Sequence, residues 1–315
     1  MLCSTCGAKL EHKTKPELLS SIPAHLPYGF RLDDGRFALK GLLGHGAFGL
    51  TYKALHKASL EMFAVKEHFP ISLCERNPNG NVVPLHGQEL EYARSLERFG
   101  REAQVLSRLH GSKSQPLFYQ LGTAYLVMDF LEGQTLEQRL RQTAKLESAF
   151  VLGILRDLLT ALEELHALGF LHRDIKPANI MLTALGAELV DFGSVTGFDV
   201  KVDTRVSARL LTPAYAPLEQ YATSIRLAPA TDFYALAASA FEALTGQIPT
   251  SAVDRANGVP LERIRFLNSD VPENLARVLE AALSLRLDAR PQNAEAFLYA
   301  LGLTPKLTIY GPNSL

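Results

Sequence analysis

The apolar positions in the first 130 residues fall into short β-prone runs. Four such runs are separated by glycine or polar residues, at 31–39, 42–43, 50–55 and 62–66. A fifth covers residues 124–131. Within residues 89–109 the apolar residues instead repeat at helical spacing, at Phe99, Ala103, Leu106 and Leu109. The pattern predicts an antiparallel sheet with one main helix.

Beyond residue 131 the pattern becomes helical. One apolar stripe has eight members: Phe150, Val151, Ile154, Leu155, Leu158, Leu159, Leu162 and Leu165. Gly169 follows as the expected C′ residue of this helix. Residues 230–245 and 273–287 are predicted to be further helices. A β-rich first third and an α-rich remainder predict an α+β chain with two lobes, divided near residues 129–133.

Composition narrows the class of protein. The 315 residues are 47% hydrophobic and 21% charged, which excludes global disorder. With 32 basic and 33 acidic residues there is no overall positive field for nucleic acid or anionic lipid, so neither partner is expected. Three cysteines indicate a reducing compartment. Because there is no apolar N-terminal run and no window of about 18 apolar residues, we expect a cytoplasmic protein without membrane insertion.

The two ends differ from the middle. Residues 1–29 are predicted to be an appendage, and residues 303–315 a tail. Cys3 and Cys6 form a single Cys-x-x-Cys, which resembles half of a zinc ribbon. Structural zinc needs four ligands, so His12, Cys74 or a second chain would have to complete a Zn²⁺ site. The favoured alternative is a tail without metal.

Two sequence features in the first third suit phosphate binding. Residues 44–49 read Gly-His-Gly-Ala-Phe-Gly and lie between predicted strands. A dinucleotide site would need a helix directly after the glycines, so this turn either covers phosphates with backbone N–H groups or is an ordinary hairpin turn. Lys66 ends an apolar strand and can act as a point charge on phosphate. Glu102, on the predicted helix, is the candidate to hold it.

A more specific signal lies at residues 172–179, His-Arg-Asp-Ile-Lys-Pro-Ala-Asn, followed by Asp-Phe-Gly at 191–193. Phosphoryl transfer needs a carboxylate that accepts the proton of the attacking hydroxyl, and Asp174 fits that role. Lys176 supplies a cation for the phosphoryl group. Asn179 and Asp191 supply the oxygen ligands that Mg²⁺ prefers. The alternative, that these residues only cap turns, does not explain two motifs at this spacing.

In their order along the chain, these motifs resemble the eukaryotic-type (Hanks-type) protein kinase family, in its bacterial Ser/Thr branch. The resemblance covers residues 30–302, with an N-lobe of about 30–130 and a C-lobe of about 131–302. It implies a protein-kinase-like bilobal fold that transfers the γ-phosphoryl group of ATP, with Mg²⁺ or Mn²⁺, to Ser/Thr hydroxyls of proteins. It also implies a role in bacterial signalling, and autophosphorylation through transient self-association.

The resemblance implies the residues that contact the nucleotide. Lys66 would pair with Glu102 in the active state, Met128 would be the gatekeeper, and the backbone of Asp129 and Leu131 would bond adenine. The full implied set is Leu43, Gly44, Gly46, Gly49, Thr51, Ala64, Lys66, Met128, Asp129, Leu131, Met181 and Asp191.

The resemblance also implies roles in the C-lobe. Lys176 is the Ser/Thr signature, and Thr212 would touch the catalytic Asp and Lys. Glu219 and Arg290 would form a buried ion pair, and Asp232 would anchor the catalytic loop. Arg173 would read a phosphorylated activation segment, with Thr204 or Ser207 as the expected site. The alternative is a segment ordered without phosphate.

Some residues depart from the family pattern. Thr51 replaces the usual Val, and residues 216–219 read Ala-Pro-Leu-Glu rather than Ala-Pro-Glu. Lys66 and Glu102 lie 36 residues apart, longer than usual, and the insertion is predicted to hold a turn at 77–80 and a helix at 88–99. Residues 110–120 look too short and polar for the usual strand pair before the hinge. That puts in doubt one N-lobe member of the hydrophobic spine, whose other members would be Leu106, His172 and Phe192.

Two rival functions remain open from the sequence. A pseudokinase scaffold would lack catalytic groups that are all present here. A small-molecule kinase of the aminoglycoside or choline type typically lacks a lysine at position 176 and a substrate loop like residues 212–219.

Overall fold

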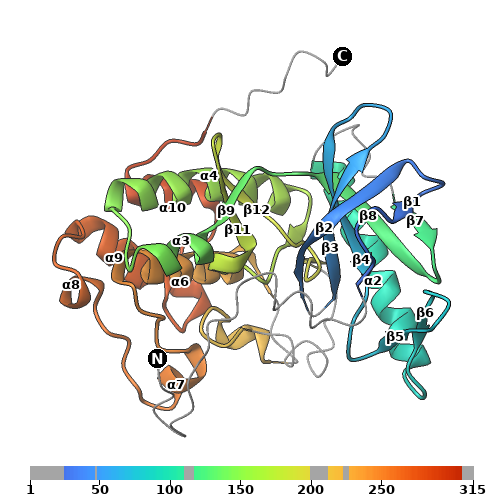
Figure 1. Ribbon diagram of the computed structural model, residues 1–315. Coiled ribbons are helices and arrows are strands. Elements are labelled where there is room, and N and C mark those ends of the chain that lie inside the picture. The colour runs from blue at the N-terminus through green and yellow to red at the C-terminus, as the bar shows by residue number, and fades with distance from the viewer. Residues whose placement is uncertain (1–24, 47, 110–116, 199–211, 223–226, 307–315) are drawn as a thin grey trace, which may run out of the picture. The chain divides into compact units, whose positions relative to one another are not determined.

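The computed structural model describes residues 25–46, 48–109, 117–198, 212–222 and 227–306 (Figure 1). The chain forms two compact units. The N-terminal unit comprises residues 1–107 and 111–130, and the C-terminal unit comprises residues 108–110 and 131–315. The first is rich in strands and the second in helices, so the α+β prediction is confirmed.

The N-terminal unit is built on an antiparallel sheet of six strands, in the order β1-β2-β3-β4-β8-β7. Their bounds are β1 (Arg31–Leu32), β2 (Phe37–His45), β3 (Gly49–His56), β4 (Met62–His68), β7 (Leu117–Gln120) and β8 (Thr123–Asp129). The glycine motif joins β2 to β3, as predicted. Within residues 31–39, Arg31 lies opposite Ala38 and Leu32 lies opposite Phe37.

The long connection after β4 contains a hairpin and a helix. The hairpin consists of β5 (Cys74–Arg76) and β6 (Val82–Pro84), and the predicted turn at 77–80 lies inside it. Helix α2 (Glu89–Leu109) follows as one element of 21 residues, so the helix expected at 88–99 is its first half and not a separate one. Glu89 and Glu91 in its first turn and Arg108 in its last complement the helix dipole.

The prediction that residues 110–120 leave no room for a strand pair before the hinge is wrong. Strand β7 pairs with β8 from Leu117 opposite Leu126 to Gln120 opposite Thr123. The connection is only Leu121 and Gly122, with φ of 52° and 74°. Such a turn matches the twist of the flanking strands, so four residues suffice for the first strand.

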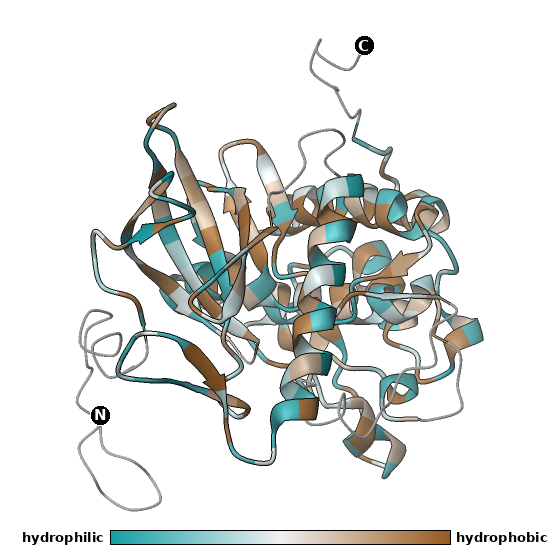
Figure 2. Cartoon of the chain, turned by 90° about the vertical axis from the view of Figure 1, so that its right-hand side faces the viewer, coloured by the Kyte–Doolittle hydropathy of each residue, from teal (hydrophilic) through white to brown (hydrophobic). Residues whose placement is uncertain are grey.

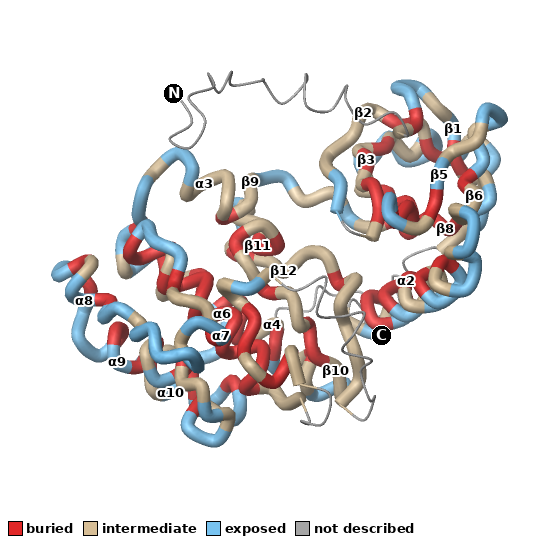
Figure 3. Tube along the Cα trace, turned by 90° about the horizontal axis from the view of Figure 1, so that it is seen from below, coloured by how far each residue is buried: buried red, intermediate tan, exposed pale blue. Residues whose placement is uncertain are grey.

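The core of the N-terminal unit is aromatic and includes residues before position 30. Tyr52, Tyr125 and Phe69 are among its fully buried side chains. Figure 3 shows buried and exposed residues alternating along α2, which lies in the same unit. Leu26 belongs to the same core, and its backbone N–H donates to Tyr52 Oη at 3.0 Å. Packed structure therefore reaches back into the segment expected to be an appendage.

The C-terminal unit is organised around two long helices, α4 (Ser148–Ala167) and α6 (Pro229–Thr245). Fifteen of the 17 residues of α6 are buried. Shorter helices are α3 (Leu136–Gln142), α7 (Ala252–Ala256), α8 (Ile264–Leu267), α9 (Glu273–Ala282) and α10 (Ala294–Leu301). Single 3₁₀ turns are η1 (Pro177–Asn179), η3 (Leu218–Gln220) and η4 (Leu287–Ala289). Figure 2 shows hydrophilic and hydrophobic residues mixed along the helix nearest the viewer.

Short strands connect the helices of this unit. Strands β9 (Gly133–Thr135), β11 (Ile180–Thr183) and β12 (Gly186–Leu189) form one small sheet, in the order β12-β11-β9. Strands β10 (Phe170–Leu171) and β13 (Thr196–Gly197) form another. The residues from β10 to β13 carry the 172–179 and 191–193 motifs.

Two helix predictions in this unit need correction. Phe150 is 48% exposed, because it lies at the margin of the stripe that Val151 and the later members bury. The helix expected over 273–287 ends at Ala282. Beyond it, the carbonyls of Ser284 and Leu285 accept hydrogen bonds from the Arg290 guanidinium instead of helical N–H groups. Gly169, at φ 82°, follows the end of α4 as predicted.

Candidate active site

The N-terminal unit brings Lys66 and Glu102 together. Lys66 lies near the end of β4, in the middle of the sheet, and Glu102 lies on the buried face of α2. Lys66 Nζ donates to Glu102 Oε1 at 2.8 Å and to Oε2 at 3.0 Å. Their side chains are 7% and 1% exposed. Removing one partner of a pair so shielded from water leaves an uncompensated buried charge, which costs far more than the loss of a surface ion pair.

Strand register places other predicted nucleotide contacts beside Lys66. Thr51 lies directly opposite Lys66, and Ala64 lies opposite Met128. Directly opposed residues share a face of the sheet, as do residues two apart on a strand, so all four side chains leave the same face. Of the other expected contacts, Asp129 ends β8, whereas Leu131 and Met181 belong to the C-terminal unit. Leu43 lies at an irregularity of the β2–β3 register.

The glycine turn is shaped by backbone contacts. Gly46 N–H donates to Gly49 O at 2.9 Å. A side chain at Gly49 would overlap the Glu67 carbonyl oxygen, so that position requires glycine. At Gly44 and Gly46 a Cβ would meet nothing within 4 Å. The backbone at these two positions is therefore open to close approach by a ligand.

In the C-terminal unit, the predicted residues Lys176 and Asn179 both contact Asp174, and Thr212 is joined to them through Lys176. Lys176 Nζ donates to Asp174 Oδ1 at 3.0 Å and to Oδ2 at 2.8 Å, and also to Thr212 Oγ1 at 3.2 Å. Asn179 Nδ2 donates to Asp174 Oδ2 at 2.9 Å and to its backbone carbonyl at 2.8 Å. These contacts fix the carboxylate in one orientation.

The backbone of this loop is anchored by Asp232 at the start of α6. The Asp232 carboxylate accepts from His172 N–H at 2.9 Å and from Arg173 N–H at 2.8 Å, and it contacts His166 Nε2 at 2.8 Å. Burial alone would raise the pKa of Asp232, but the hydrogen bond and charge of His166, together with the other donors, lower it. Asp232 therefore stays ionised, and it holds Arg173 at a positive φ of 68°.

The Asp-Phe-Gly segment lies beside the loop. Val190 N–H donates to Asn179 O at 2.9 Å, which brings Asp191 next to Asn179 along the chain path. Asp191 has a φ of 64°, uncommon for a residue with a side chain. The rings of His172 and Phe192 have centroids 4.9 Å apart. Two of the expected spine members are thus in contact within this unit.

Burial governs the electrostatics at Asp174. It raises the pKa of the Asp174 carboxyl above its ordinary value, and the nearby Asp191 adds to the rise, while Lys176 opposes it. Burial also lowers the pKa of Arg173. Raised carboxylate pKa values at a cluster of titratable groups are typical of sites that handle protons.

The Glu219–Arg290 pair is fully formed. Arg290 Nη1 donates to Glu219 Oε1 at 2.6 Å, and Nη2 donates to Oε2 at 3.1 Å. Arg290 also binds the Ala230 carbonyl and lies 4.8 Å from the Tyr234 ring centroid. The extra leucine in residues 216–219 therefore does not remove this ion pair, which ties η3 to α6.

Several predicted residues lie outside the described part of the chain: Cys3, Cys6, His12, Thr204 and Ser207. Cys74 is described, and it does not suit a zinc site. It is buried in the N-terminal unit, where its thiol donates to Pro70 O at 3.3 Å, and burial raises its pKa to about 12. Among the described residues, no group of three or more His, Cys, Asp or Glu could hold a metal ion.

The sequence did not reveal some polar contacts around the site. His166 continues the apolar stripe of α4, four residues after Leu162, and its side chain is only 9% exposed, but nothing in the pattern linked it to Asp232. Tyr215 Oη donates to Glu242 Oε2 at 2.5 Å, which ties the substrate-loop region to α6. Glu67 and Arg76 form a buried pair in the N-terminal unit. A charged residue within a strand gives no periodic signal that it is buried.

The strand-rich unit, the helical unit and the side-chain cluster around Asp174 in the second are the features of a protein kinase. The chain belongs to that family, because the sequence profile described as "Protein kinase domain" matches residues 37–296. The fold assignment also holds against a solved structure, the apo form of PpkA-294. That structure has a TM-score of 0.77 and 29% identity, over 88% of this chain and 99% of the other.

The chain is similar to several bacterial serine/threonine-protein kinases. Serine/threonine-protein kinase F of Synechocystis sp. is 35% identical over 70% of this chain and 46% of its own length. PknA of Nostoc sp. is 31% identical over 87% of this chain and 48% of its own. The chain thus spans about half the length of these relatives. No helix among the described residues is long and apolar enough to cross a membrane.

Proposed function

We propose that this chain is a protein serine/threonine kinase that transfers the γ-phosphoryl group of ATP to Ser/Thr hydroxyls of proteins. The observation that supports it most strongly is the Asp174 carboxylate, oriented by Lys176 and Asn179. In the proposed step the acceptor hydroxyl gives its proton to Asp174, and its oxygen forms a bond to the γ-phosphorus. The bond from that phosphorus to the ADP oxygen breaks. Lys176 stabilises the charge on the transferred group.

The donor set near Asp174 fits a magnesium or manganese ion. Because Asn179 Nδ2 donates to Asp174, its Oδ1 points away from that carboxylate. Asp191 directly follows Val190, whose N–H donates to Asn179 O. One amide oxygen and one carboxylate, completed by phosphate and water, are what Mg²⁺ accepts. When bound, the ion would neutralise charge on the phosphates.

The N-terminal unit is proposed to bind the triphosphate. Lys66, held by Glu102, supplies a cation at the face that Thr51, Ala64 and Met128 share. At Gly44 and Gly46 no side chain stands in the way of a phosphate that approaches the turn. We propose kinase domain limits of residues 30–302.

A protein acceptor is favoured over a small molecule. Thr212 binds Lys176, and the residues after it are fixed by the Glu219–Arg290 pair and by the Tyr215–Glu242 hydrogen bond. A substrate loop so firmly attached to the catalytic lysine suits the recognition of a polypeptide. A pseudokinase scaffold is disfavoured, because Lys66, Glu102, Asp174 and Asn179 all make the contacts that catalysis needs. The expected cytoplasmic location and signalling role stay predictions from the sequence.

The proposed function is tested by following label from γ-labelled ATP in the presence of Mg²⁺ or Mn²⁺. Casein and myelin basic protein serve as generic acceptors, with kanamycin and choline as small-molecule alternatives. We expect metal-dependent label on serine and threonine of the proteins. Label on the small molecules alone would reassign the activity, and no label on any acceptor, with or without metal, would indicate a scaffold.

The raised pKa of Asp174 predicts the pH dependence of the reaction. Asp174 must be ionised to accept a proton, so activity is lost as the pH falls through its pKa. Since burial raises that pKa, the acidic limb of kcat/KM should lie at higher pH than for an ordinary aspartate. Lys176→Met removes the group that opposes the rise and should move the limb further up. A limb that stays in place or moves to lower pH in this variant would contradict the assignment.

Regulation by autophosphorylation is proposed for Thr204 or Ser207. Arg173 is the residue expected to read the phosphate, and its side chain now donates from Nη1 to Ser194 O at 3.5 Å. Phosphopeptide mapping of the active protein, after incubation with Mg-ATP, should find phosphate on one of the two residues. Active protein with both residues unmodified would remove the proposal and leave an activation segment ordered without phosphate.

A further inference from the structure

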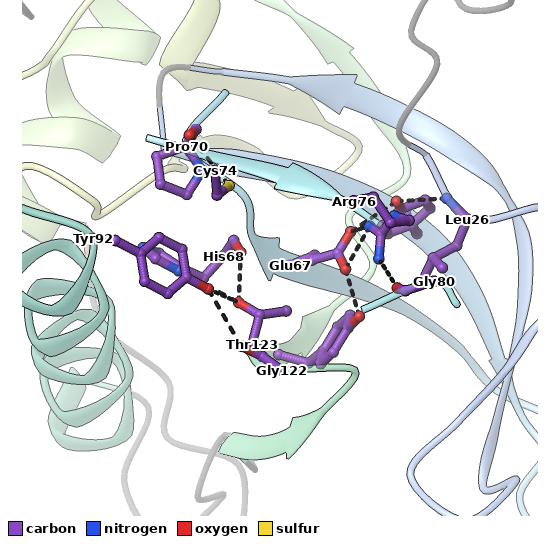
Figure 4. Close-up of polar contacts among 12 residues, drawn as sticks. Leu26, Glu67, His68, Pro70, Cys74, Arg76, Gly80, Tyr92, Gly122 and Thr123 are labelled. Atoms are coloured by element: carbon purple, nitrogen blue, oxygen red, sulfur yellow. Dashed lines mark hydrogen bonds and ion pairs between the residues drawn. The ribbon is translucent and has the colours of Figure 1, made fainter. Parts of the chain in front are cut away.

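The hairpin β5–β6 forms a buried polar cluster directly behind Lys66. Glu67, the next residue in β4, is fully buried, and its side chain leaves the opposite face of the sheet. Arg76 Nη2, from the hairpin, donates to Glu67 Oε1 at 2.9 Å and to Oε2 at 2.8 Å (Figure 4). Arg76 Nη1 also donates to Gly80 O at 2.9 Å, so the guanidinium closes the hairpin on itself.

Two tyrosines complete the cluster from the neighbouring strands. Tyr52 Oη, on β3, donates to Glu67 Oε2 at 3.0 Å, and Tyr125 Oη, on β8, donates to Oε1 at 2.5 Å. Burial, and then the charge of Glu67, raise the pKa of both phenols, so both stay protonated as donors. The Glu67 carboxylate therefore joins β3, β4 and β8 at the register where Lys66 lies.

The same hairpin also reaches the helix that carries Glu102. Val82 N–H, on β6, donates to Leu121 O at 2.7 Å, at the β7–β8 turn. Tyr92 Oη, in the first turns of α2, donates to Thr123 Oγ1 at 3.1 Å, and Thr123 Oγ1 donates to His68 O at 2.6 Å. The hairpin is thus linked to β4 through Glu67 and to α2 through the β7–β8 turn.

We propose that Arg76 is a positioning residue for the Lys66–Glu102 pair, acting through Glu67 and the hairpin β5–β6. This inference rests on the proposed function. It assigns a role to the connection between β4 and α2, which places Lys66 and Glu102 unusually far apart in the sequence. The hairpin holds the strand of one partner and the helix of the other. The pair is thereby kept assembled from within the N-terminal unit.

The charges make Arg76 the informative position. Glu67 is fully buried and the Arg76 side chain is 11% exposed, so losing the guanidinium alone leaves a buried carboxylate without its cation. Arg76→Met is therefore expected to be less stable as well as less active. The double variant Glu67→Gln/Arg76→Met removes both charges, and a neutral pair of similar volume is often tolerated. The double variant therefore separates the effect of Arg76 on the position of the Lys66–Glu102 pair from its effect on the stability of the chain.

The experiment measures kcat, KM for Mg-ATP and thermal midpoint for the wild-type chain, Arg76→Lys, Glu67→Gln/Arg76→Met, Glu102→Gln and the triple variant. We expect the double variant to keep a midpoint near wild type while kcat/KM falls about tenfold. Arg76→Lys, which keeps the charge but not the two-pronged donor, should fall about threefold. Arg286→Met is the control, since Arg286 also donates two hydrogen bonds to a carboxylate, that of Asp288, but in an exposed pair of the other unit.

A double-mutant cycle with Glu102→Gln tests whether Arg76 acts through the Lys66–Glu102 pair. If Arg76 acts through the Lys66–Glu102 pair, adding the double substitution to Glu102→Gln should lower kcat/KM by less than about a further twofold. The proposal would be overturned if the losses in kcat/KM of the double variant and of Glu102→Gln multiply in the triple variant. It would also be overturned if the double variant keeps the kcat/KM of the wild-type chain. If the double variant does not fold, Arg76→Lys and its combination with Glu102→Gln give the same two readings. Wild-type kcat/KM in Arg76→Lys, or multiplicative losses, would then overturn it.

Titration with a fluorescent ATP analogue keeps this inference separate from the proposed function. Nucleotide affinity depends on Lys66 but needs no transfer of phosphate. A wild-type chain that binds Mg-nucleotide but labels no acceptor would refute the kinase activity, while the affinities of the variants would still test Arg76.

Discussion

Replacing Asp174 by alanine is expected to lower kcat for protein phosphorylation by a factor of about 10³ or more. The substitution removes the proton acceptor and also the anchor for Lys176 and Asn179. Such a loss combines the contribution of a general base with that of orientation. Steady-state rates with a generic protein acceptor at saturating Mg-ATP measure it.

A matched control for Asp174→Ala is Asp288→Ala. Asp288 also accepts from a cationic side chain, Arg286, but its side chain is 70% exposed in the same unit. It should leave kcat unchanged. Asp174→Ala protein that retains the wild-type rate would show that the observed phosphorylation comes from a contaminant or from another mechanism.

Lys66→Met should lower kcat/KM for Mg-ATP by about 10²-fold. The methionine keeps most of the length of the side chain but removes the cation, and it leaves the buried Glu102 carboxylate without Nζ. Groups that stabilise charge on a transferred phosphoryl group are typically worth about this much each. Both kcat and the affinity for a fluorescent ATP analogue should fall.

Lys40→Met is the control for Lys66→Met. Lys40 lies on β2 of the same sheet, where its ammonium is 5.4 Å from the Tyr28 ring centroid. Its loss should not change nucleotide affinity. Equal effects at positions 40 and 66 would indicate a general electrostatic attraction for ATP, and not a specific contact of Lys66.

The sequence predicted the parts of the site that depend on local patterns. The glycine turn was predictable because three glycines lie between two β-prone runs. Asp174, Lys176 and Asn179 were predictable because their chemistry is confined to eight consecutive residues. Glu102 was a candidate partner for Lys66 because it lies on a predicted helix, and the resemblance to a family then implied the pair, although 36 residues separate the two.

Other parts depend on contacts that no local pattern encodes. Strands β5 and β6 have three residues each, too few for a period to show. From the sequence, Glu67 and Arg76 would ordinarily be predicted to be exposed to solvent, and only tertiary packing buries them together. Strand β7 was missed because Leu121 and Gly122 form a turn whose positive φ values the sequence did not suggest.

The most direct test of the account is a crystal structure of the chain with Mg²⁺ and a non-hydrolysable ATP analogue. We predict one nucleotide whose phosphates contact Lys66 Nζ, with the ion bound by Asn179 Oδ1 and the Asp191 carboxylate. Asp174 should face the γ-phosphate. A nucleotide that binds elsewhere, or one that Lys66 and Asp191 do not share, would contradict the account.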